Sequence, residues 1–203
     1  MRAARASASI DGGSTELPQP GESGDPILAG ALRVAQSLDG DALGNMVATW
    51  RRAPLQALAR LHLLAAADLV EDAEELGRPR TEPGVAERLD GLAQLVTGGT
   101  NAPAPVLAAV VHGELSVLNP FGVADGIVAR AASRLVCVAS GLDTRNLGVP
   151  EVHWMRRLQA YRDGVAGFGA GTVEGVGGWV LFCCGSLEAG AREAGSIAEA
   201  FAG

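Results

Sequence analysis

The 203-residue chain contains no lysine, so all 16 of its basic residues are arginines. The absence of lysine excludes Schiff-base chemistry and excludes the lysine of a phosphate-binding P-loop. The 23 acidic residues give a formal net charge of −7, and no basic cluster is larger than the pairs Arg51-Arg52 and Arg156-Arg157. A chain of this charge repels a phosphate backbone, so we expect no nucleic-acid partner.

Long apolar runs are absent as well. No run approaches the ~20 residues needed to span a bilayer, and residues 1–13 lack the apolar core of a signal peptide. The chain has only three cysteines, Cys137, Cys183 and Cys184. An odd number cannot pair completely, and the adjacent two lack the Cys-x-x-Cys spacing of a metal site. The sequence therefore predicts a cytoplasmic protein with reduced, buried thiols, no metal site and no membrane contact.

Aromatic residues make up 4% of the chain and hydrophobic residues 48%. Such a core consists mainly of alanine, leucine and valine, which favours close-packed helices. The length suits one domain over residues 1–203. Apolar spacing, proline and capping residues predict an irregular, flexible loop over 13–25 and helices over 26–38, 54–70, about 85–97, 105–118 and about 126–141, with two more beginning at 150 and about 172. The sequence thus predicts an all-α bundle.

One dodecapeptide, from Asn119 to Arg130, carries the clearest motif. It reads Asn-Pro-Phe-Gly-Val-Ala-Asp-Gly-Ile-Val-Ala-Arg and resembles the Fic active-site pattern His-Pro-Phe-x-(Asp/Glu)-Gly-Asn-Gly-Arg-x-x-Arg. Four positions match, namely Pro120, Phe121, Gly126 and Arg130. The base position of the pattern holds Asn119, and the other departures are Val123, Ala124, Asp125 and Ile127.

The flanking segments extend the resemblance over nearly the whole chain. Residues 105–118 are similar to the helix that precedes the Fic motif, which makes residues 105–141 a helix-loop-helix hairpin. Tyr161 and Trp179 occupy the places of the aromatic residues on two closing helices. Residues 76–80 resemble the start of the target-positioning flap, with Gly77 and Arg80 as its key residues and a short β-hairpin as the expected form up to Val85.

The first twelve residues hold a second Fic-like pattern. Ser7, Asp11 and Gly12 fit the inhibitory sequence (Ser/Thr)-x-x-x-Glu-(Gly/Asn), with aspartate in place of glutamate. The resemblance implies that residues 1–12 form an inhibitory helix in which Asp11 pairs with Arg130. A plain helix end with Gly12 as its cap fits the same residues. Similar chains carry more helical sequence ahead of this pattern, so we expect either a shortened chain or a start upstream of Met1.

The substitutions weaken the activity that the resemblance implies. In a Fic enzyme the motif histidine is the general base, and an asparagine such as Asn119 has no usable proton affinity near pH 7. Val123 removes the carboxylate that would hold Mg²⁺. The turn and following helix could still bind an anion through Phe121, Gly122, Asp125, Gly126 and Arg130, with ATP or another nucleotide as a weakly held ligand. Alternatively, Asp125 caps that helix and Arg130 is tied to Asp11, which gives a closed loop.

Three histidines are the remaining candidates for a base. His112 lies seven residues before Asn119, roughly 10 Å away along a helix axis, so we expect a packed, structural side chain. His62 lies within an apolar run and is also expected to be structural, whereas His153 is expected near the edge of a pocket.

Two hypotheses follow from these residues. The first is a non-catalytic, regulatory or partner-binding Fic-like pseudoenzyme with a protein partner. The second is a diverged group-transfer enzyme of the adenylyltransferase type. The sequence leaves assembly as a homo-oligomer open.

Overall fold

A computed structural model describes residues 1–19 and 24–202 of the chain, with side chains described as far as residue 200. All regular elements in this part are helices, which confirms the predicted all-α class. They are α1 (Arg2–Ile10), α2 (Pro26–Ser37), α3 (Gly40–Arg52), α4 (Pro54–Ala66), η1 (Ala73–Glu75), α5 (Val85–Gln94), η2 (Leu95–Gly99), α6 (Ala104–Leu118), α7 (Asp125–Ala139), α8 (Pro150–Arg156), α9 (Leu158–Gly169) and α10 (Val173–Ala202).

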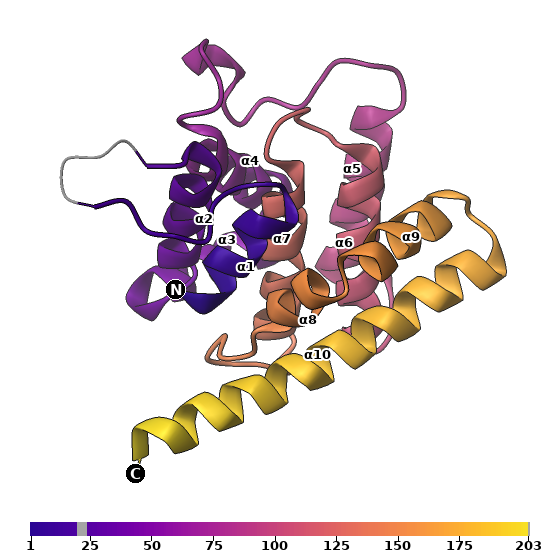
Figure 1. The fold of residues 1–203 in the computed structure, drawn as a ribbon. Coiled ribbons are helices and arrows are strands. Elements are labelled where there is room, and N and C mark those ends of the chain that lie inside the picture. The colour runs from indigo at the N-terminus through magenta and orange to yellow at the C-terminus, as the bar shows by residue number, and fades with distance from the viewer. Residues whose placement is uncertain (20–23, 203) are drawn as a thin grey trace.

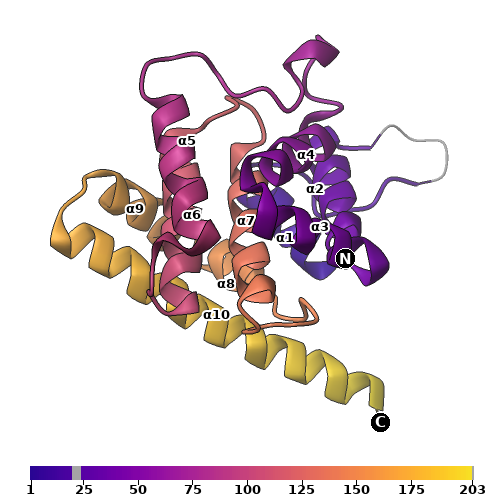
Figure 2. The ribbon, with the colours of Figure 1, turned by 180° about the vertical axis from the view of Figure 1, so that it is seen from behind.

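Helix α7 lies at the centre of the bundle (Figure 1 and Figure 2). Most of its residues are buried, from Asp125 at its first turn to Val138 near its end. Helices α2, α3 and α4 pack on one side of α7. Helix α6, which precedes α7 and is joined to it by a short loop, packs along it in a roughly antiparallel direction. The predicted helix-loop-helix is therefore present, and it forms the core of the fold.

Helix α1 lies across the bundle, where it packs against both α2 and α8. Its buried face consists of small residues and Ile10, so the helix lies close to its neighbours. Gly12, with φ +87°, ends this helix in the left-handed conformation, and the N–H of Gly13 donates to the Ala8 carbonyl at 2.9 Å. This end geometry is common at helix C-termini and directs the chain away after Asp11.

The last helix, α10, packs against α6, α8 and α9, and its C-terminal part extends past the body of the molecule (Figure 1). The indole of its Trp179 is fully buried and donates a hydrogen bond to the Ala109 carbonyl at 2.8 Å. Tyr161 on α9 is also buried, so the two aromatic residues do lie on two helices that close over α6.

Two sequence-based expectations need correction. Helix α3 was not predicted, although Asp39 accepts the Gly40 N–H at its start and Leu43, Met46, Val47 and Trp50 form a buried face. The expected β-hairpin flap is wrong, because residues 76–84 form two turns joined by irregular backbone, and the part of the chain that the structure describes contains no strand. The expected loop over 13–25 lies partly outside the described residues, at 20–23.

No described helix combines the length and the apolar composition that crossing a bilayer requires. Cys137 and Cys183 are buried free thiols, as expected, while Cys184 is only partly buried. Burial raises the pKa of the Cys137 thiol to about 12, so this thiol stays protonated at neutral pH.

Candidate functional site

The loop between α6 and α7 begins and ends in left-handed backbone. Asn119 has φ +46° and Ala124 φ +56°. Asparagine adopts this conformation more readily than most residues, so Asn119 serves locally as the residue that ends α6. Its side chain is an amide at the position where the family pattern has the catalytic base.

Asp125, the first residue of α7, forms a hydrogen bond back to the loop. Its Oδ1 accepts the backbone N–H of Phe121 at 2.9 Å, and the residue is 6% exposed. Burial raises the pKa of this carboxyl to about 6, although the backbone hydrogen bond and the charge of Arg80 act in the opposite direction. The expectation that Asp125 caps α7 is wrong, because the side chain reaches back to the loop and the helix start has no side-chain cap. Its negative charge therefore lies against a loop amide that could otherwise face an anion.

Arg80 holds the other side of the loop. Its backbone N–H donates to the Pro120 carbonyl at 2.7 Å, its Nε to the Asn119 carbonyl at 2.8 Å and its Nη2 to the Leu118 carbonyl at 3.1 Å. The guanidinium thus satisfies carbonyls at the end of α6, where a positive charge is favourable. A Cβ on Gly122 would lie 3.2 Å from Arg80 Cδ, so glycine allows this close contact.

Gly77, the other expected flap residue, contacts a histidine to which sequence reasoning assigned only a structural role. Its N–H donates to His62 Nδ1 at 2.9 Å, and the His62 ring stacks on Phe121 with a centroid distance of 4.2 Å. Burial lowers the pKa of His62, so the ring is neutral at pH 7. No sequence signal joins His62 to Phe121, because only the packing of α4 against the loop brings them together.

Arg130 is the centre of a buried polar cluster. Its Nη2 forms a salt bridge with Asp11 Oδ2 at 2.6 Å, which confirms the predicted contact. Its Nε donates to Ser7 Oγ at 2.8 Å and its Nη2 to the Ser7 carbonyl at 3.0 Å. Both ends of the inhibitory-like segment therefore hold the same guanidinium, whose side chain is 1% exposed.

Gly126 is required for this contact. A Cβ at this position would lie 2.6 Å from Asp11 Oδ1 and 3.0 Å from Arg130 Nη1. The Asp11 carboxylate thus lies against the first turn of α7, where the helix dipole favours negative charge. Two carboxylates, those of Asp11 and Asp125, consequently lie near the start of one helix, and the charge of Asp11 disfavours ionisation of Asp125.

The cluster continues inward from Arg130. Its Nη1 donates to the Tyr161 hydroxyl at 3.4 Å, and that hydroxyl lies 2.9 Å from His112 Nε2. His112 is fully buried against Trp154 and Trp179, and burial keeps its pKa well below the usual value. The expectation of a packed histidine at this position is confirmed. His153, the third candidate, contacts Phe182 of α10 and is only partly buried.

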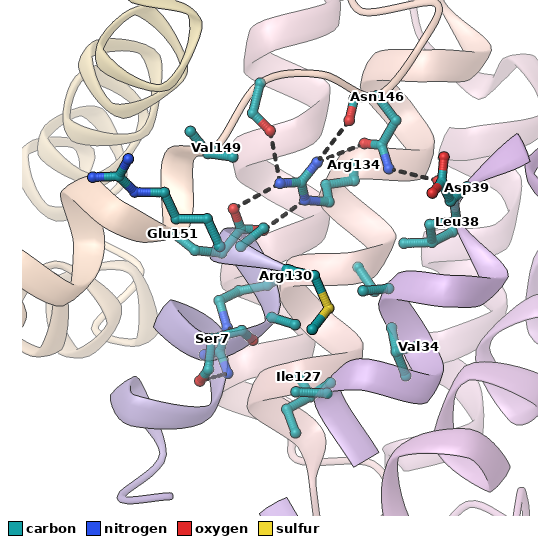
Figure 3. Close-up of a pocket in the computed structure, with 18 of the residues that line it drawn as sticks. Ser7, Val34, Leu38, Asp39, Ile127, Arg130, Arg134, Asn146, Val149 and Glu151 are labelled. Carbon is teal, nitrogen blue, oxygen red and sulfur yellow. Dashed lines mark hydrogen bonds and ion pairs between the residues drawn. The ribbon is translucent and has the colours of Figure 1, made fainter. Parts of the chain in front are cut away.

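A second arginine, which sequence reasoning missed, lies one turn further along α7, and its side chain is 11% exposed. Arg134 forms a bidentate salt bridge with Glu151 at 2.6 and 2.8 Å, and it also donates to Asn146 Oδ1 and the Gly148 carbonyl. Figure 3 shows this network at one side of a cavity of about 230 Å³ that lies between α1, α2 and α7. The two partners of the salt bridge are 17 positions apart and belong to no shared motif, so no local pattern in the sequence signals their pairing.

Within residues 1–19 and 24–202, no three His, Cys, Asp or Glu side chains come together as a group that could hold a metal ion. Val123, at the position where the family pattern has a metal-binding carboxylate, is 36% exposed. Comparison of the sequence with models of protein families finds no match, and comparison with curated proteins finds none either.

Proposed function

We propose that this chain is a Fic-like protein with a degenerate active-site loop, acting as a non-catalytic regulatory or partner-binding module. The observation that carries the proposal is that the protein's own side chains occupy both groups of the loop region that could bind an anion, the Arg130 guanidinium and the Phe121 amide. Asp11 and Ser7 hold Arg130, while Asp125 lies against the loop amide of Phe121. The resemblance gives Arg130 the role of holding a nucleotide phosphate, and a residue already held by a carboxylate is not free for that contact.

The chemistry of the loop supports loss of catalysis. General-base catalysis contributes about 10² to 10⁴ in rate, and Asn119 cannot accept a proton near pH 7. Val123 offers no oxygen ligand to the Mg²⁺ that neutralises phosphate charge in such transfers. An incoming nucleotide would in addition meet the charges of Asp11 and Asp125. These effects all oppose adenylyl transfer.

The proposed partner is another protein, which would bind over the outer surface of the loop. Val123 in this loop is 36% exposed, so the loop presents an apolar side chain to a partner. We place the protein in the cytoplasm, because its three free thiols fit a reducing compartment.

The decisive assay is transfer from labelled ATP in the presence of Mg²⁺. We expect no labelling above background for the wild-type chain, for Asp11→Gly, which frees Arg130, or for Asn119→His, which restores only the base. Robust Mg²⁺-dependent labelling by the wild-type chain would contradict the proposal.

A diverged group-transfer enzyme is the second candidate, and Asp125 at the loop favours it. The pKa of its carboxyl is raised to about 6, so this group could exchange a proton near neutral pH, while the neutral His62 ring stacks on Phe121 and positions the loop. If the wild-type chain transfers a group, His62→Gln and Asp125→Asn should each abolish the transfer. Arg60→Gln, an exposed change on the same helix as His62, is the matched control.

A further inference from the structure

The cavity of about 230 Å³ beside α7 results from small side chains on three helices. It is lined by Ala3 and Ala4 of α1, Ala31 and Ala35 of α2 and Ala131 of α7. Where alanines face one another, adjacent helices leave space that larger side chains would fill. An engineered cavity of about 150 Å³ accommodates a benzene molecule, so this one is large enough for a single ring with a short substituent.

The cavity has two chemically different sides (Figure 3). Val34, Leu38 and Ile127 form an apolar side, and the network of Arg134, Asn146 and Glu151 forms a polar one. A ligand that fits both sides has an apolar body and one polar group.

The charges along the lining indicate the sign of that polar group. Four arginines line the cavity, namely Arg2, Arg130, Arg134 and Arg145, against the two carboxylates of Asp39 and Glu151. Glu151 pairs with Arg134 and Asp11 pairs with Arg130, while Glu193 is shared by Arg2 and Arg156. Arg145 is exposed and forms no ion pair or hydrogen bond with any described residue.

We propose that this cavity binds a small organic carboxylate whose apolar body is of the size of a single ring. The body lies between Val34, Ile127 and the alanines, and the carboxylate points to the opening, where Arg145 is the cation that no described residue pairs with. The other three arginines of the lining are paired with carboxylates and Asp39 caps the start of α3, so Arg145 is the cation of the lining that remains available to an anion. The proposal goes beyond the proposed function and does not depend on it.

Binding in this cavity would also affect α1. The ligand would contact Ala3 and Ala4 of α1 and Ile127 and Ala131 of α7, so it would join the two helices. A molecule that binds only when α1 and α7 are packed together stabilises the contact between these two helices. Because the ligand would hold α1 against α7, amide hydrogen exchange in α1, the helix that carries Ser7, should slow when the ligand binds.

Isothermal titration calorimetry with benzoate tests the proposal, with benzyl alcohol as the uncharged analogue. We expect one benzoate per wild-type chain and binding of benzyl alcohol that is about tenfold weaker. Arg145→Gln should weaken benzoate by a similar factor and leave benzyl alcohol unchanged. Arg60→Gln, at an exposed arginine of α4, is the matched control and should bind like the wild type.

Ala35→Leu fills the space from a partly buried position and should abolish binding of both compounds, with an unchanged circular dichroism spectrum as evidence of folding. Three results would overturn the proposal. These are no saturable benzoate binding by the wild-type chain, equal affinity for the two compounds, or benzoate binding that neither Arg145→Gln nor a folded Ala35→Leu variant changes.

Discussion

Arg130 and Arg134 lie one turn apart on α7 and each pairs with a carboxylate, yet their surroundings differ. Arg134 faces Glu151, whose side chain is 3% exposed, and both carboxylate oxygens accept from it. Arg130 faces Asp11, whose side chain is 26% exposed and uses one oxygen. Water therefore reaches the carboxylate of the Arg130 pair more readily than the carboxylate of the Arg134 pair.

The origins of the two partners differ as well. Glu151 and its neighbours Asn146 and Gly148 follow α7 closely in the chain, so they form one compact unit with Arg134. Asp11 comes from the end of a helix at the start of the chain, and a glycine at position 126 makes room for it. Arg134 therefore anchors the fold, while Arg130 has a partner that another anion could replace.

Removal of Glu151 should have the largest effect. Glu151→Ala leaves Arg134, whose side chain is only 11% exposed, without its counter-charge, and loss of one partner of such a largely buried pair costs about 3–5 kcal/mol. Urea unfolding followed by circular dichroism would measure the loss. A cost below about 1 kcal/mol would mean that the Arg134 pair is not the structural one.

Removal of Asp11 should cost less. Arg130 keeps its bonds to Ser7 and Tyr161, and water can reach the vacated position, so Asp11→Ala should lower the free energy of unfolding by about 1–2 kcal/mol. The same urea titration applies. A cost equal to that of Glu151→Ala would remove the difference between the two arginines.

A substitution at Gly126 tests the contact between Asp11 and the first turn of α7 from the side of α7. Gly126→Ala places a Cβ where the Asp11 carboxylate lies, so it should destabilise the chain by about 1 kcal/mol. In the Asp11→Ala background the same change should cost clearly less, since only the contact with Arg130 Nη1 at 3.0 Å remains. Fully additive costs in the double variant would show that Gly126 acts through something other than Asp11.

Asp125 gives the smallest expected change, with a distinct pH dependence. Its folded-state pKa of about 6 lies above the ordinary 3.8, so the folded state binds this proton more tightly than the unfolded state. The stability that this group contributes is then greatest below about pH 4 and decreases as the pH rises to about 6. Asp125→Asn should therefore raise the free energy of unfolding by about 0.5–1 kcal/mol at pH 7, with a smaller gain at pH 4.5. Urea titrations at the two pH values measure both gains, and an equal gain would contradict the raised pKa.

Most helices could be predicted from the sequence, because capping residues and prolines mark where they begin. Asp25 and Pro26 mark the start of α2, where Asp25 Oδ1 accepts the Leu28 N–H at 2.7 Å, and proline opens α4 and α8 as well. Helix α3 carries comparable signals at Asp39 and Trp50, so its pattern was readable although it was not predicted. The flap prediction failed for another reason, because the backbone N–H groups of Gly77 and Arg80 donate to His62 and Pro120, outside the segment, and not to a neighbouring strand of a hairpin.

Contacts in the candidate site could be predicted from the sequence only where a motif linked residues that are far apart in the chain. The contact between Asp11 and Arg130 could be predicted because two family-like patterns named both partners. The stacking of His62 on Phe121 and the salt bridge between Arg134 and Glu151 depend on how helices and loops pack, and no motif named either pair. The expected cap of α7 by Asp125 is wrong, because the local geometry directs its carboxylate to the Phe121 amide of the loop.

The most direct test of the account is a calorimetric titration with pyrophosphate at pH 7 and low salt. We expect no binding to the wild-type chain and binding of one pyrophosphate to the double variant Asp11→Ala/Asp125→Asn, in which both carboxylates are neutralised or removed. Adding Arg130→Met to the double variant should abolish that binding. Wild-type binding as tight as that of the double variant, or no binding by the folded double variant, would contradict the claim that these carboxylates occupy an anion site at Arg130.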